Sequence, residues 1–209
     1  SIKFIETKFE KLEKTNEKIL FDLANYYRSK KKYEKAIPLY SELINRFNKK
    51  DKTQSNLLYR RGSSFERIGS YEDADMDLQS SLEIDPDDAY VLNYLAYSWL
   101  ERNYKIDKAI EMLEIAYSLE SDDPYIIDSI GWAYFLIKDY IKAEKFLIRA
   151  VQLMPDDPIV NDHYGDVLWK LNRKIQARYF WSNVLLMDEV EKEIIEKINF
   201  KISNGLKDS

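Results

Sequence analysis

Cysteine is absent from the 209-residue sequence, and histidine occurs once, at His163. Without thiols the chain has no disulfide scaffold, no thiolate nucleophile and no thiolate metal site, and one imidazole excludes a metal site built on several histidines. The five glycines form no glycine-rich phosphate loop, and no apolar run approaches the ~18 residues of a transmembrane helix. We therefore expect neither a cofactor nor a metal, and no insertion of this segment into a membrane.

The residues that are present are those of a folded, acidic protein. Apolar residues make up 45% of the sequence and aromatic residues 14%, including 16 tyrosines, whereas disordered chains are poor in aromatics. The formal net charge is −5, although residues 1–50 hold 13 Lys and Arg against 7 Asp and Glu. Because nucleic-acid-binding domains are usually basic, we expect no nucleic-acid partner. We interpret the basic start as a solvated helix surface, with a phosphate-binding patch as the alternative.

Five segments of the sequence align with one another. They begin at residues 17, 55, 89, 124 and 158, at spacings of 38, 34, 35 and 34 residues. A small residue recurs in the first half of each segment and an alanine in the second half: Ala24, Gly62, Ala96, Gly131 and Gly165, then Ala36, Ala74, Ala109, Ala143 and Ala177. Small side chains allow two helices to approach closely. In this period and these residues the sequence resembles the tetratricopeptide repeat family, whose unit is a helix pair of about 34 residues.

The resemblance implies an all-α fold, a right-handed superhelical solenoid of helix-turn-helix repeats with capping helices at its ends. The repeats would occupy residues 17–50, 55–88, 89–123, 124–157 and 158–191, with a capping helix or the remnant of a preceding repeat at 1–16 and a capping helix and tail at 192–209. In the last of these segments, Ile194 and Ile198 share one stripe with Val190. The third to fifth repeats are similar to those of bacterial envelope-associated family members, so we favour a bacterial envelope or periplasm over the cytoplasm.

Two Asp-Asp-Pro motifs mark expected helix starts. Asp123 and Asp157 directly precede Pro124 and Pro158, which is the pattern of an N-cap aspartate followed by proline at the first helical position. The alternative interpretation, a calcium site, lacks the ligand spacing of an EF-hand loop. We therefore predict helices that begin at residues 124 and 158.

The resemblance also implies a binding surface on the concave face, which the first helix of each repeat lines. In the third to fifth repeats the groove positions are rich in aromatic residues and include a polar column of Asn93, Asp128 and Asp162. We predict a non-enzymatic adaptor that binds an extended peptide or partner segment with basic and apolar residues in this groove, because aromatic anchors and charge-assisted hydrogen bonds favour such binding. The alternative is a structural or self-associating module of a longer polypeptide whose groove is covered by its own chain. The predicted groove residues are Tyr90, Asn93, Tyr94, Tyr97, Tyr125, Asp128, Trp132, Phe135, Asp162, His163, Asp166 and Trp169.

His163 is a candidate general base, because Asp162 and Asp166 lie close to it in the sequence. Helical spacing by itself places Asp166 beside His163, and no nucleophile is paired with them, so we interpret His163 as a surface or groove residue and expect no enzyme. Asn25 and Arg60 match part of the carboxylate clamp of chaperone-binding family members, but Phe21 stands where that clamp has lysine. The resemblance therefore does not extend to a chaperone clamp.

Overall fold

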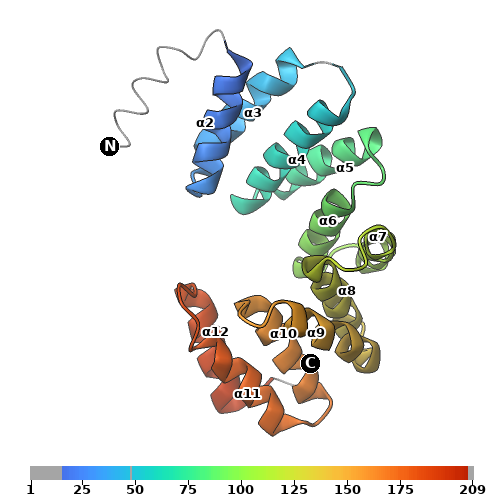
Figure 1. Ribbon diagram of the computed structural model, residues 1–209, viewed down its shortest axis with the longest axis vertical. Coiled ribbons are helices and arrows are strands. Elements are labelled where there is room, and N and C mark those ends of the chain that lie inside the picture. The colour runs from blue at the N-terminus through green and yellow to red at the C-terminus, as the bar shows by residue number, and fades with distance from the viewer. Residues whose placement is uncertain (1–15, 48, 207–209) are drawn as a thin grey trace. The chain divides into compact units, whose positions relative to one another are not determined.

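The computed structural model describes residues 16–47 and 49–206, and this part of the chain consists of helices joined by turns, without a strand (Figure 1). The all-α fold predicted from the repeats is thereby confirmed. The expected capping segment at residues 1–16 lies outside the described residues except for Asn16, whose side chain accepts a hydrogen bond from the Lys18 N–H. The helices are α2 (Glu17–Ser29), α3 (Tyr33–Arg46), α4 (Lys52–Arg67), α5 (Tyr71–Ile84), α6 (Ala89–Glu101), α7 (Ile106–Leu119), α8 (Pro124–Leu136), α9 (Tyr140–Leu153), α10 (Pro158–Lys170), α11 (Lys174–Val184) and α12 (Lys192–Asn204).

The chain forms two compact units, residues 1–95 and 96–209, and the division falls within α6. In the first unit, α2 packs on α3, α3 on α4, and α4 on α5. In the second unit the same sequential packing runs from α7 through α12, the part coloured olive to red in Figure 1. Each helix therefore buries its apolar stripe mainly against its neighbours along the chain, which is how repeat proteins build a core. None of the helices in the described ranges has the length and apolar content of a membrane span.

The recurring small residues lie where paired helices cross closely. A Cβ atom added to Gly131 of α8 would come within 2.7 Å of the Leu147 Cγ on α9, and one added to Gly165 of α10 within 2.4 Å of the Trp181 Nε1 on α11. Contacts this short do not occur between real atoms, so only glycine permits these two crossings. The alanines of the second helices have no exposed surface either: Ala36, Ala74, Ala109, Ala143 and Ala177. The structural role predicted for the small positions is confirmed.

Aspartate side chains begin several of the helices. Asp123 accepts hydrogen bonds from the N–H groups of Tyr125 and Ile126, and Asp157 caps α10 in the same way, each with proline at the start of the helix. Both predicted N-caps are confirmed. Asp51 caps α4 through the N–H groups of the second and third helical residues, so α4 begins at Lys52, three residues before the second repeat was expected to begin.

Candidate functional site

The predicted groove residues differ widely in their exposure. Tyr90 and Tyr125 are exposed, at 55% and 61%. Asn93, Tyr94, Tyr97, Phe135 and Trp169 are half-buried. Asp128, Trp132, Asp162, His163 and Asp166 are buried, each at 9% exposure or less. Tyr90, Asn93 and Tyr94 belong to the first unit and the others to the second. The carboxylates expected to face a ligand are thus inside the second unit.

The buried side chain of His163 on α10 contacts two residues of α8. Its Nδ1 lies 3.0 Å from both carboxylate oxygens of Asp128 on α8, and its ring stacks on Trp132 with 4.0 Å between ring centroids and an interplanar angle of 11°. Burial by itself lowers the pKa of His163, but the charge and hydrogen bond of Asp128, together with the charges of Asp162 and Asp166, outweigh burial and hold the pKa above its usual value. The expectation that His163 is exposed at the surface is wrong, since its exposure is 4%, whereas its place in the groove stays a prediction. The hydrogen-bond partner of His163 is Asp128 rather than Asp166.

A second buried charge cluster joins α10 to α12. Lys201 donates to Asp162 and, at 2.7 and 2.8 Å, to both oxygens of Asp166. Trp181 Nε1 also donates to Asp166, at 3.0 Å, and Lys197 Nζ lies 3.2 Å from Asp162. The five side chains therefore satisfy one another, and α12 occupies the positions of α10 that were expected to face a peptide.

The pKa values of the two aspartates of this cluster are shifted in opposite directions. Burial raises the pKa of Asp166 to about 6, helped by the negative charge of Asp162. Burial also acts to raise the pKa of Asp162, but Lys201 and Lys197 outweigh it and hold that pKa below its usual value. Within the described residues no group of three or more His, Cys, Asp or Glu side chains is placed to hold a metal ion. The cluster is a set of mutually neutralising ion pairs between helices.

Lys201 is the member of this buried cluster that the sequence did not lead us to expect. Its exposure is 4%, although lysine is almost never fully buried without a charged partner. A signal was present, because Lys201 follows Ile198 by three residues and so lies on the same helical stripe as Ile194 and Ile198. A lysine on the apolar stripe of a helix indicates a buried carboxylate opposite it.

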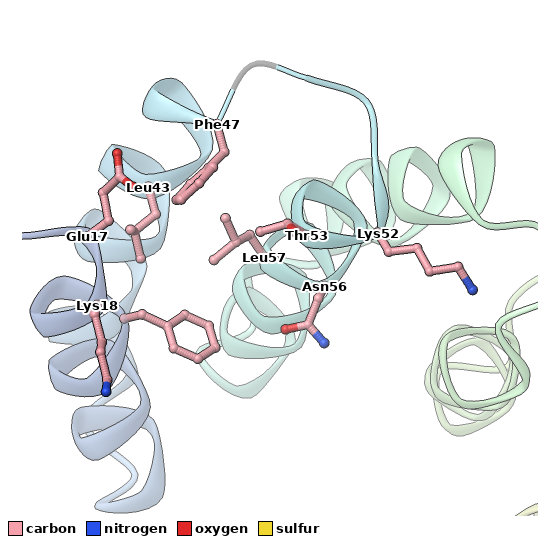
Figure 2. Close-up of a pocket in the computed structure, with 9 residues that line it drawn as sticks. Glu17, Lys18, Leu43, Phe47, Lys52, Thr53, Asn56 and Leu57 are labelled. Atoms are coloured by element: carbon pink, nitrogen blue, oxygen red, sulfur yellow. The ribbon is translucent and has the colours of Figure 1, made fainter.

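The first unit has an accessible cavity between α2, α3 and α4, with a volume of about 580 Å³. Its apolar lining comes from Phe21 on α2, Leu43 at the end of α3, Phe47 just beyond it and Leu57 on α4, and Figure 2 shows Leu43, Phe47 and Leu57 gathered around the space between these helices. The exposed side chains of Glu17, Lys18, Lys52, Thr53 and Asn56 complete the lining.

A second cavity of the same unit, about 400 Å³ in volume, is polar. Three guanidinium groups line it, from Arg28 on α2 and from Arg60 and Arg67 on α4, together with Asn25 and Tyr94. Arg60 also lies over the ring of Phe21, with 5.3 Å from its Cζ to the ring centroid. Since Phe21 lines the apolar cavity, the two cavities are neighbours on the same side of α2 and α4.

Comparisons with known proteins agree with this fold. The tetratricopeptide repeat model matches residues 17–49 and 55–88. A TPR repeat-containing protein of Pseudomonas aeruginosa, PA4667, is 35% identical over 111 residues, which are 53% of this chain and 19% of that protein. The aligned part is thus about a fifth of that relative's length.

Solved structures of tetratricopeptide-type proteins are similar in fold at low sequence identity. MamA from Desulfovibrio magneticus superposes with a TM-score of 0.66 at 18% identity, covering 84% of this chain and 97% of that one. PilF from Pseudomonas aeruginosa gives a TM-score of 0.70 at 14% identity, covering 90% and 88%. A tetratricopeptide repeat protein from Parabacteroides merdae gives 0.73 at 16% identity, covering 91% and 72%. These similarities bear on the fold alone.

Proposed function

We propose that this chain, which is a tetratricopeptide-repeat protein, is a protein-interaction module that binds an apolar side chain of its partner in the cavity between α2, α3 and α4. The tetratricopeptide fold supports a role in protein–protein interaction, and proteins of this family are generally non-enzymatic scaffolds. The observation that carries the finer proposal is the cavity of about 580 Å³ with its apolar lining.

The form of this cavity suits a binding anchor. Its volume falls in the range of about 300–1,000 Å³ that is typical of ligand sites. Phe21 and Phe47 are half-buried, so their rings have surface left to cover, and buried aromatic and aliphatic contacts at the centre of an interface supply most of its binding energy. Charged and polar side chains surround them, as in the rim of protein interfaces.

A steric block of the cavity tests the proposal. Thr53 is an exposed lining residue near the start of α4, so Thr53→Trp should fill the opening, whereas Thr53→Ala leaves it open. With a photo-crosslinking amino acid in place of Lys18 at the rim, we expect a partner to be captured in cells that make the protein, and the capture to persist with Thr53→Ala and to be lost with Thr53→Trp. Equal capture by both variants, at unchanged helix content, would show that the partner does not use this cavity.

For the second unit we propose the structural alternative, in which its own chain covers the groove. The observation that favours it is the ion-pair cluster of Lys201 with Asp162 and Asp166, which holds α12 over α10. With these carboxylates neutralised inside the chain, they give no reason to expect a basic partner. The exposed Tyr125 and the half-buried Phe135 stay available for contacts.

A further inference from the structure

Three arginines of the first unit line one polar cavity, and the described residues place little negative charge beside them. Arg28, Arg60 and Arg67 line the cavity of about 400 Å³. Near them, Glu66 lies 3.6 Å from Arg67 Nε and accepts a hydrogen bond from the Tyr94 hydroxyl at 2.9 Å. Among the residues that the structure describes, one carboxylate therefore lies beside three guanidinium groups.

The hydrogen bonds of Arg28 and Arg60 all go to neutral oxygens within the described part of the chain. Arg60 donates through Nε to Asn56 at 2.7 Å and through Nη1 to Asn25 at 3.0 Å, and Arg28 donates to the Ser63 hydroxyl at 3.2 Å. These contacts hold the guanidinium groups in place without cancelling their charge.

Arg61, the next residue of α4, shows what a satisfied arginine looks like in this fold. Its Nε and Nη2 donate to the two carboxylate oxygens of Asp77 at 2.6 and 2.7 Å, a bidentate pair with Asp77 buried. Such planar pairs are the strong form of the arginine–carboxylate interaction. Arg61 is thus part of the packing of α4 on α5, whereas Arg28 and Arg60 keep the capacity to bind a carboxylate.

We propose that the arginine cavity binds the carboxylate side chains of an acidic segment in a protein partner, next to the apolar residue that enters the neighbouring cavity. This rests on the proposed function, which it extends by naming the partner's chemistry. Several acidic side chains fit better than a single chain-terminal carboxylate, because three guanidinium groups from two helices offer more charge than one carboxylate balances.

The distance between the two cavities sets the spacing of the partner's residues. Along α4 the apolar lining lies at residues 53–57 and the arginine lining at residues 60–67. At 1.5 Å per residue the centres of these two stretches are about 13 Å apart along the helix axis. An extended peptide covers that length in about four residues. The partner segment should therefore carry its acidic run about four residues from its apolar anchor.

Two synthetic peptides test this with the full chain. One carries a leucine followed, about four residues later, by three consecutive glutamates, and the other has glutamines in place of the glutamates; both are dye-labelled and amidated at the C-terminus. By fluorescence anisotropy at low salt we expect the glutamate peptide to bind at least about tenfold more tightly. This advantage should shrink as salt is added, because a Debye length of about 10 Å at 0.1 M screens the charges.

The arginines are tested by a charge-matched pair of triple variants. Removing the cavity charges should abolish the advantage of the glutamate peptide, whereas removing three positive charges elsewhere should leave it intact. Each variant's helix content and melting are compared with those of the wild type, so that misfolding is recognised. The test variant is Arg28→Gln/Arg60→Gln/Arg67→Gln and the control is Arg46→Gln/Lys145→Gln/Lys192→Gln.

The outcomes separate this proposal from the proposed function. The carboxylate site would be overturned by any of three results. These are equal binding of the two peptides, the same advantage of the glutamate peptide in both triple variants, and tighter binding of a single-stranded oligonucleotide than of the glutamate peptide. Binding in the apolar cavity is tested separately, by the loss of peptide affinity on a leucine-to-alanine change in the peptide and on Thr53→Trp in the protein. Loss of the glutamate effect with a retained leucine effect would support binding in the apolar cavity and exclude carboxylate binding in the arginine cavity.

Discussion

Replacing Gly165 by alanine should force apart two helices of the second unit. The new Cβ would lie 2.4 Å from Nε1 and 2.5 Å from Cδ1 of Trp181. Trp181 has no exposed surface, so its ring cannot move outward without displacing its neighbours. Its Nε1 donates to Asp166, and a shift of the ring would also break that hydrogen bond.

Three contributions set the size of the effect. Overpacking by a methyl group costs about 1–3 kcal/mol, and losing a hydrogen bond to a charged group costs about 1.5–3 kcal/mol. The higher helix propensity of alanine returns at most about 1 kcal/mol. We therefore expect Gly165→Ala to lower the free energy of unfolding by about 2–4 kcal/mol, and to lower the melting temperature by about 5–15 °C for a chain of this length.

Thermal and urea unfolding followed by circular dichroism measure this loss, and a double variant shows its cause. Trp181→Phe removes the indole N–H edge that the new methyl would strike. The double variant should thus be less destabilised than the sum of the two single variants, by about 1 kcal/mol or more. A melting temperature of Gly165→Ala at or above that of the wild type would refute the close crossing of α10 and α11. If the free-energy losses of the two single variants were additive, the destabilisation by Gly165→Ala would not come from a clash with Trp181.

Two further predictions concern the buried charges. Lys201→Met should lower the free energy of unfolding by about 3–5 kcal/mol, because it leaves buried carboxylates without their cation. Lys197→Met, at a lysine side chain that is 57% exposed, should lower it by about 1 kcal/mol or less. Urea titration at neutral pH compares the two variants, and equal losses would contradict the conclusion that Lys201 is the buried cation of the cluster. The pKa of His163 lies above its usual 6.5 in the folded chain, so its stabilisation by Asp128 is fully present below pH 6.5 and is lost as the pH rises through the folded-state pKa. The free energy of unfolding of the wild type, measured from pH 6 to 9, should therefore fall relative to that of His163→Gln. If the two free energies changed in parallel with pH, this linkage would be excluded.

The buried charges show how first helices of the second unit are joined to one another. Asp128 on α8 pairs with His163 on α10, and Asp162 on α10 pairs with Lys201 on α12. In each case an acidic residue of one first helix meets a basic residue of the next helix that lies beside it. The polar column predicted to lie in the peptide-binding groove is, in α8 and α10, a row of contacts between successive helices.

The period and the small residues of the sequence were sufficient to predict the helices and their close crossings. Gly131 and Gly165 recur at the predicted spacing and lie at helix crossings, because a period of about 34 residues with a small residue in each helix admits few other arrangements. The N-caps Asp123 and Asp157 were equally predictable, since an aspartate before a helix-initiating proline is a local signal that needs no tertiary contact. These features depend on residues close together in the chain.

The tertiary structure alone decided which polar residues are buried and with which partners. Asp128 and His163 are 35 residues apart in the sequence, and Asp162 and Lys201 are 39 apart, so no local pattern distinguishes these ion pairs from a set of solvated groove residues. Only the tertiary structure likewise shows that Arg28 on α2 and Arg60 on α4 line one cavity, whereas Arg61 donates to Asp77. Periodicity fixes the face of a helix on which a side chain lies, but the charge that it meets there is set by the packing of another helix, and that packing exists only in the folded chain.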